Sequence, residues 1–124
     1  MKMGTAFNVI IIGAIAWFLF QRYVPAKGIK NINTRELKAQ LSNKGSKQFI
    51  DVRTPNEYRG NHIKEFKNIP LFELHKRAQE LSKDEEVFVI CQSGMRSSKA
   101  SKSLKKLGFK EVTNVKGGMS AWHN

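Results

Sequence analysis

The sequence predicts one three-layer α/β domain, in which helices flank a central parallel sheet, preceded by a single apolar N-terminal helix. From residue 29 onward short β-like runs alternate with helical ones, an order typical of a parallel sheet with helical crossovers. The run 86–91 is apolar at four consecutive positions, as expected of a central strand that is covered on both faces. A chain of 124 residues is long enough for one such core and not for two.

The first 23 residues are dominated by an uncharged apolar run, residues 4–20. As a helix this run rises about 25 Å, which is at the short end for crossing a bilayer. No clear small-x-small cleavage site follows it, so a cleaved signal is the weaker alternative, as is a buried helix. Lys and Arg are more frequent after the run than before it. The positive-inside rule therefore predicts a single-pass anchor in the cell membrane over residues 1–23, with the following domain facing the cytoplasm.

Residues 24–28 contain Pro and Gly and are predicted to be a linker, which leaves residues 29–124 as the domain. Residues 29–32 are predicted to be its first strand. Asn33 with Glu36 three positions later is a helix-capping signature, and Gly45 suits the end of the helix that follows. Residues 48–52 are predicted to be the second strand, followed by a helical turn at 55–59.

The second half of the domain repeats this alternation. Residues 68–70 are predicted to be extended, and the spacing of apolar residues predicts a helix over 71–81. The strand 86–91 comes next, and a helix over 97–107 ends at Gly108. A last strand at 111–115 and a closing turn at 119–122 complete the domain.

Cys91 is the only cysteine of the chain, which excludes an internal disulfide and leaves too few thiolates for a Cys-rich zinc site. We expect no metal ion and no cofactor. The thiol loop, residues 91–97, joins the apolar strand to the next helix, so Cys91 falls at the carboxyl edge of the sheet, where open α/β proteins bind ligands. Gly94 permits a curled backbone whose N–H groups converge on one centre, and the helix N-terminus and Arg96 add positive charge. These features predict an anion site in which Cys91 is partly a thiolate.

Four segments in this order resemble the rhodanese family, over roughly residues 32–122. They are Asp51-Val-Arg-Thr-Pro-Asn-Glu-Tyr58, Asn61-His-Ile63 through Asn68-Ile-Pro70, Cys91-x-x-Gly94-x-Arg96-Ser97, and Lys116-Gly-Gly-Met-Ser-Ala-Trp122. The sequence departs from the family pattern at Asn61, where Gly is usual, and at Glu65-Phe66, where Gly-Ala is usual. These departures put the turn around His62 in doubt and leave the thiol loop untouched.

The resemblance implies a sulfurtransferase in which the Cys91 thiolate takes sulfur from a small anionic donor such as thiosulfate. The resulting persulfide passes that sulfur to cyanide, to a thiol or to a protein acceptor, by covalent catalysis. By the same resemblance, the loop that follows Cys91 binds the persulfide and substrate, with Arg96 orienting an anionic donor. The loop residues are Gln92, Ser93, Gly94, Met95, Arg96 and Ser97. Ser97 either caps the next helix, which is the preferred interpretation, or donates to the sulfur. Four further residues are interpreted as structural support: Asp51, Arg53, Glu57 and His62.

Two other functions stay open. Cysteine phosphatases of a related fold space Cys and Arg by five residues, whereas Cys91 and Arg96 are separated by four, so the shorter loop suits a single sulfur better than a phosphoryl group. The formal net charge of +12 also allows a tethered binding module, with basic residues clustered at Arg96, Lys99, Lys102, Lys105 and Lys106. No aromatic residues interleave with this patch, so nucleic-acid binding is not expected. Apposition to anionic lipid and attraction of anionic donors account for the charge more simply.

Overall fold

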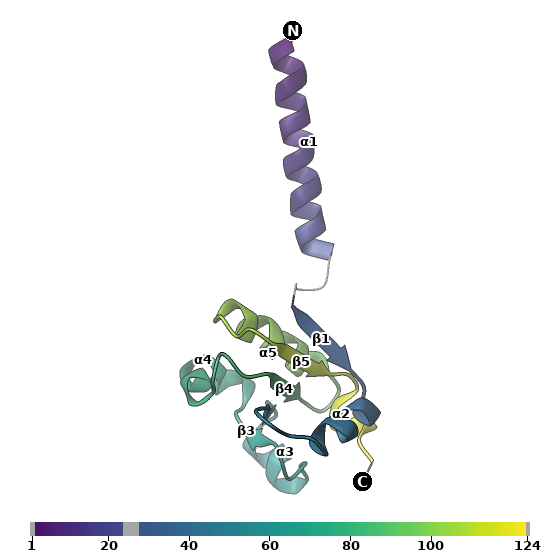
Figure 1. The fold of residues 1–124 in the computed structure, drawn as a ribbon, viewed down its shortest axis with the longest axis vertical. Coiled ribbons are helices and arrows are strands. Elements are labelled where there is room, and N and C mark those ends of the chain that lie inside the picture. The colour runs from purple at the N-terminus through teal and green to yellow at the C-terminus, as the bar shows by residue number, and fades with distance from the viewer. Residues whose placement is uncertain (1, 24–27, 124) are drawn as a thin grey trace.

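A computed structural model describes residues 2–23 and 28–123 of the chain. Five parallel strands form one sheet in the order β1-β5-β4-β2-β3 (Figure 1). The elements in chain order are α1 (Lys2–Tyr23), β1 (Ile29–Ile32), α2 (Thr34–Leu41), β2 (Gln48–Asp51), α3 (Pro55–Gly60), β3 (Lys67–Asn68), η1 (Leu71–Glu73), α4 (Leu74–Arg77), η2 (Ala78–Glu80), β4 (Val87–Ile90), α5 (Met95–Lys106), β5 (Val112–Val115) and α6 (Gly118–Ala121). The predicted α/β domain with a central parallel sheet is confirmed.

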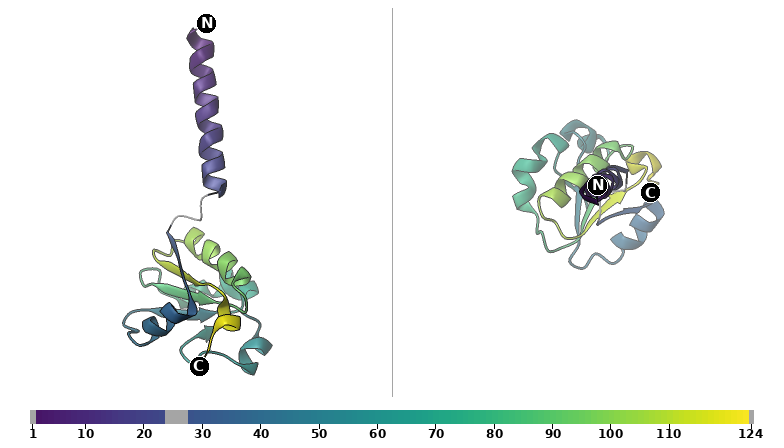
Figure 2. Two further views of the ribbon diagram at one scale, coloured as in Figure 1. Left: turned by 90° about the vertical axis from the view of Figure 1, so that its right-hand side faces the viewer. Right: turned by 90° about the horizontal axis from the view of Figure 1, so that it is seen from above.

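The middle strand β4 is buried at all four positions and separates two apolar clusters. Alternate side chains of a strand point to opposite faces, so Val87 and Val89 join one cluster while Phe88 and Ile90 join the other. Helices α4 and α5 cover the first face, and α2 with α6 covers the second (Figure 2). By the same alternation Cys91 falls on the α5 side of the sheet.

Most of the predicted elements are confirmed to within a residue or two, but the predicted helix over 71–81 is broken. It consists of the short helices η1, α4 and η2, because the backbone at Glu73 and Arg77 departs from helical angles, with φ of −105° and −102°. Its predicted apolar stripe nevertheless packs on the core. The capping signature at Asn33 is also confirmed, since its side chain accepts from the Glu36 N–H at 2.8 Å.

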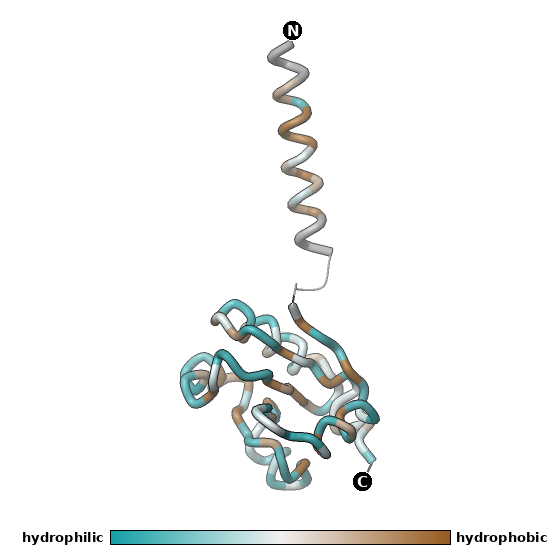
Figure 3. Tube along the Cα trace, viewed as in Figure 1, coloured by the Kyte–Doolittle hydropathy of each residue, from teal (hydrophilic) through white to brown (hydrophobic). Residues whose placement is uncertain are grey.

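Helix α1 projects away from the domain, and its described side chains, residues 6–19, are exposed and mostly apolar (Figure 3). Within the described residues, no helix combines the length and the hydropathy that a membrane crossing needs. This finding contradicts the predicted location, single-pass in the cell membrane with the domain facing the cytoplasm, and it gives no support to the predicted anchor or to the membrane and lipid partners. The anchor prediction rested on the absence of charge in residues 4–20, a local pattern that does not by itself establish a membrane span. Residues 24–27 of the predicted linker lie outside the described residues.

A glycine turn after β5 brings α6 against the start of the thiol loop. The N–H groups of Met119 and Ser120 donate to the carbonyl oxygens of Cys91 and Gln92 at 2.8 and 2.9 Å. Gly118 has a φ of +55°, and a Cβ there would collide with the carbonyl oxygen of Cys91. Only glycine therefore lets α6 approach the loop this closely.

We predict that Gly118→Ala lowers the free energy of unfolding by about 3 kcal/mol or more, because left-handed strain adds to a clash with fixed backbone. The matched control is Gly45→Ala, since Gly45 has a similar φ of +49° but open space around it. This control should lose only about 1–2 kcal/mol, the backbone penalty alone. Urea denaturation of both variants measures the difference, and equal losses would contradict the close-approach argument.

Candidate active site

The thiol of Cys91 lies directly after β4, and the residue is fully buried. The Gly94 N–H donates to Cys91 Sγ at 3.0 Å, and Ser97 Oγ lies 3.3 Å from the sulfur. Gly94 reaches this position with a φ of +108°, which a side chain would rarely adopt. The predicted convergence of loop donors on one centre is thus present, and that centre is the sulfur atom.

These donors favour the ionised form of the thiol. Burial by itself raises the pKa of Cys91, because a low dielectric disfavours charge. The Ser97 hydroxyl and the N–H groups of Ser97, Gly94 and Ser93 outweigh burial, so the net pKa lies below the usual value of a thiol. Neutral dipoles rather than Arg96 are therefore the main cause of the lowered pKa.

The predicted role of Ser97 as a helix cap is wrong. Helix α5 begins two residues earlier, at Met95, and its N-cap position is Gly94, which offers no side-chain cap. Ser97 is buried inside the first turn, where its hydroxyl lies beside the sulfur and donates to the Gly94 carbonyl oxygen at 3.1 Å. The Met95 side chain, by contrast, is exposed.

Arg53 connects the loop to the first motif from a buried position. Its guanidinium donates to both carboxylate oxygens of the fully buried Asp51, with the shortest distance 2.8 Å from Nη2 to Oδ2. It also donates to the Asn61 carbonyl oxygen at 2.6 Å and to Gln92 Oε1 at 3.2 Å. The other end of the Gln92 amide donates to Ser120 Oγ at 3.2 Å. Gln92 is therefore held between the first and last motifs.

Arg96 is paired with Glu57. Its Nη1 and Nη2 atoms donate to the two carboxylate oxygens at 2.7 and 2.9 Å, which is a bidentate pair. The pKa of Glu57 is lowered to about 2, mainly by this hydrogen bond to Arg96 and further by the backbone and hydroxyl of Thr54. Thr54 and Glu57 form a capping box at the start of α3. The carboxylate is thus fixed from two sides.

In the part of the chain that the structure describes, His62 contacts the preceding helix α3 rather than the thiol loop. Its ring stacks on Tyr58 with centroids 3.8 Å apart, and its Nδ1 lies 2.7 Å from the Tyr58 carbonyl oxygen. The unusual Phe66 nearby is buried and packs against Phe49, with centroids 5.3 Å apart. The large side chain of Phe66, which departs from the family pattern at this turn, is therefore accommodated in the core.

Three residues that hold the site were not singled out from the sequence. Thr54 had a detectable signal, because Thr-Pro-Asn-Glu matches the capping-box pattern. Gly118 and Ser120 belong to the last of the four motifs, residues 116–122, but nothing in the sequence indicates that α6 contacts the thiol loop. Among the described residues, no group of three or more His, Cys, Asp or Glu side chains is placed to hold a metal ion.

The chain is similar to two proteins of Bacillus subtilis. It is 37% identical over 116 residues to the uncharacterized protein YqhL of Bacillus subtilis, a match that covers 94% of this chain and 86% of YqhL. It is 39% identical over 94 residues to the putative sulfurtransferase YtwF of the same organism, which covers 76% of this chain and 90% of YtwF.

The fold is similar to the crystal structure of a rhodanese-like domain protein from Staphylococcus aureus, with a TM-score of 0.71 and 35% identity. That match covers 77% of this chain and 92% of the other. The family model of the rhodanese-like domain matches residues 33–124, which include all the motifs described above. The chain therefore belongs to the rhodanese-like domain family.

Proposed function

We propose that this protein is a sulfurtransferase that carries sulfane sulfur on Cys91, with residues 29–124 as the catalytic unit. The observation that carries the proposal is the surroundings of the Cys91 sulfur, which accepts from the Gly94 N–H at 3.0 Å and lies 3.3 Å from the Ser97 hydroxyl oxygen. A lowered thiol pKa provides the nucleophile that such a reaction needs. The similarity to YtwF, a putative sulfurtransferase, supports the same chemistry.

In the first step the Cys91 thiolate attacks the outer sulfur of the donor. A sulfur–sulfur bond forms on Cys91, and the bond inside the donor breaks with its electron pair remaining on the leaving group, which is sulfite when the donor is thiosulfate. The product is a Cys91 persulfide anion. The loop N–H groups that stabilise the thiolate are positioned to stabilise this second anion as well.

In the second step a thiol or cyanide attacks the outer sulfur of the persulfide. Cyanide leaves as thiocyanate, and the bonding electrons return to Cys91 as a thiolate, so no redox cofactor takes part in the cycle. Since Cys91 is fully buried, its sulfur has to become accessible before the donor and the acceptor can reach it. Four residues of the loop, Gln92, Ser93, Met95 and Arg96, are exposed or half-buried, which supports their proposed role in binding the donor.

We predict that Cys91→Ala abolishes thiocyanate formation from thiosulfate and cyanide, because the chain has no second thiol to take over. Intact-mass measurement after incubation with thiosulfate should show a gain of about 32 Da, one sulfur atom, in the natural protein and none in the variant. Circular dichroism should show the same fold for both. A variant that still formed thiocyanate would exclude Cys91 as the sulfur carrier.

Ser97→Ala should raise the pKa of Cys91, because the thiolate loses the hydroxyl that contributes most to stabilising it. The pH titration of thiolate absorbance, and the rise of activity with pH, should both move to higher pH. Ser101→Ala is the matched control, since Ser101 is also buried in α5 but donates to the Ser97 carbonyl oxygen rather than contacting the sulfur. If both variants titrated like the natural protein, the hydroxyl would have no role in ionising the thiol.

A further inference from the structure

Arg53, which contacts the thiol loop, and Arg96, which belongs to it, are each paired with a carboxylate. Arg53 is paired with Asp51 and is only 3% exposed, so it has little contact with solvent. Arg96 is about one-third exposed and is the cation that an incoming donor meets, but its guanidinium is bound in bidentate fashion by Glu57. A small anion that binds Arg96 must therefore displace Glu57 or share the guanidinium with it.

Glu57 is not a side chain that moves aside easily. Its Oε1 atom accepts from the Thr54 N–H at 3.0 Å and from the Thr54 hydroxyl at 3.1 Å, in addition to Arg96. A pKa of about 2 keeps the carboxylate ionised throughout the physiological range. Its negative charge opposes an approaching anion, and the repulsion is about twice as large for a dianion as for a monoanion.

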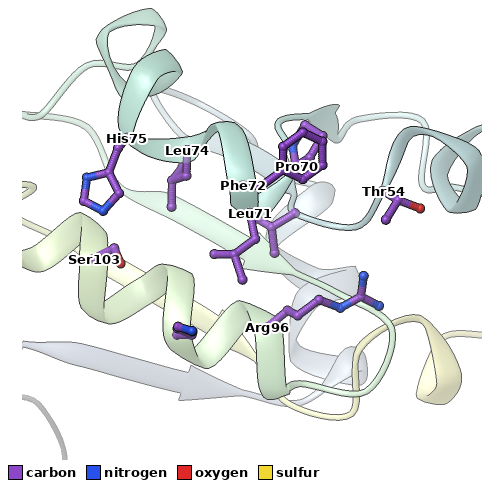
Figure 4. Close-up of a pocket in the computed structure, with 10 residues that line it drawn as sticks. Thr54, Pro70, Leu71, Phe72, Leu74, His75, Arg96 and Ser103 are labelled. Carbon is purple, nitrogen blue, oxygen red and sulfur yellow. The ribbon is translucent and has the colours of Figure 1, made fainter.

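A cavity of about 500 Å³ adjoins this ion pair and lies between α5 and the η1–α4 segment (Figure 4). Arg96 lies at the Thr54 end of this cavity, and His75 lies with Ser103 at the other. Its walls are largely apolar and its lining contains no acidic side chain. The apolar lining residues are Val52, Pro70, Leu71, Phe72 and Leu74, and Lys99 adds a second cation.

The cavity is next to the strand that ends at the thiol. Val52 donates its N–H to the carbonyl oxygen of Ile90, the residue before Cys91, at 2.9 Å, and it packs in the same apolar cluster as Cys91. Phe72 lies on the rim of the cavity. Its side chain is 76% exposed, which is unusual for a large aromatic residue. An apolar group bound in the cavity therefore lies on the same face of the sheet as Cys91 and beside Arg96.

The geometry points to Glu57 as a specificity-determining residue that disfavours dianionic donors at Arg96, and to the adjoining cavity as the binding site for the apolar group of an organic sulfane-sulfur donor with one negative charge. This inference rests on the proposed sulfurtransferase function. With benzenethiosulfonate as the donor, the Cys91 thiolate takes the outer sulfur, the bond between the two donor sulfurs breaks, and benzenesulfinate leaves with the electron pair.

The test compares thiosulfate, a dianion without an apolar group, with benzenethiosulfonate, a monoanion with a phenyl ring. Glu57→Gln removes the charge but keeps a side chain that can complete the capping box. It should lower KM for thiosulfate about tenfold and KM for benzenethiosulfonate about threefold or less, because the freed Arg96 attracts the dianion more strongly. Glu57→Ala frees Arg96 in the same way and is the second variant if the glutamine form melts at a lower temperature.

Phe72→Ala tests the cavity separately. Because the side chain is exposed, its removal should leave the melting temperature unchanged. It should raise KM for benzenethiosulfonate about fivefold, and so lower the ratio of kcat/KM for the aryl donor to kcat/KM for thiosulfate. Glu80→Gln is the control for charge removal, because Glu80 pairs with Arg77 and Lys67 away from the thiol loop and should leave both donors unaffected.

The outcomes separate the two proposals. If the natural protein forms no Cys91 persulfide from either donor, the sulfurtransferase function itself fails. If it transfers sulfur but the Glu57 variant leaves the preference between donors unchanged, the specificity role of Glu57 is overturned. If Phe72→Ala leaves KM for the aryl donor unchanged, the cavity is not the site of its apolar group.

Discussion

The contact between α6 and the thiol loop is the constraint on which the site depends. Two N–H groups of α6 bind the carbonyl oxygens of Cys91 and Gln92, which directs these carbonyls away from the sulfur. The following peptide groups then present their N–H ends to it, as the Gly94 N–H does at 3.0 Å. A segment near the C-terminus therefore helps to fix the electrostatics of a loop that lies 28 residues earlier in the sequence.

In the part of the chain that the structure describes, the site stabilises an anion mainly with neutral donors. Dipoles from the loop backbone and Ser97 lower the thiol pKa, while Arg96 and Arg53 are each neutralised by a carboxylate. Fixed neutral donors need no reorganisation when charge moves from donor to persulfide and back. This arrangement separates activation of the nucleophile from recognition of the sulfur donor. The charge beside Arg96 can be changed by substituting Glu57, while the hydrogen bonds to the Cys91 sulfur stay in place.

The sequence predicted the features that depend on local pattern. The apolar run before Cys91 located the central strand, and Asn33 with Glu36 located the start of α2. It did not predict the Arg96–Glu57 pair, since the two residues are 39 positions apart and pair only because α3 and α5 meet. It misplaced Ser97 because Gly94 starts the helix by its backbone conformation alone, without a side-chain signal. The anchor prediction rested on the uncharged apolar run at residues 4–20, and the described residues contain no helix that could span a membrane.

The single cysteine has a consequence for how the protein survives oxidants. A sulfenic acid formed on Cys91 has no second thiol in the chain with which to condense, so reduction has to come from a separate thiol compound. Further oxidation to the sulfinic acid would be permanent unless a dedicated repair enzyme intervened. The lifetime of the protein under peroxide is therefore set by the reducing power of its surroundings rather than by its own fold.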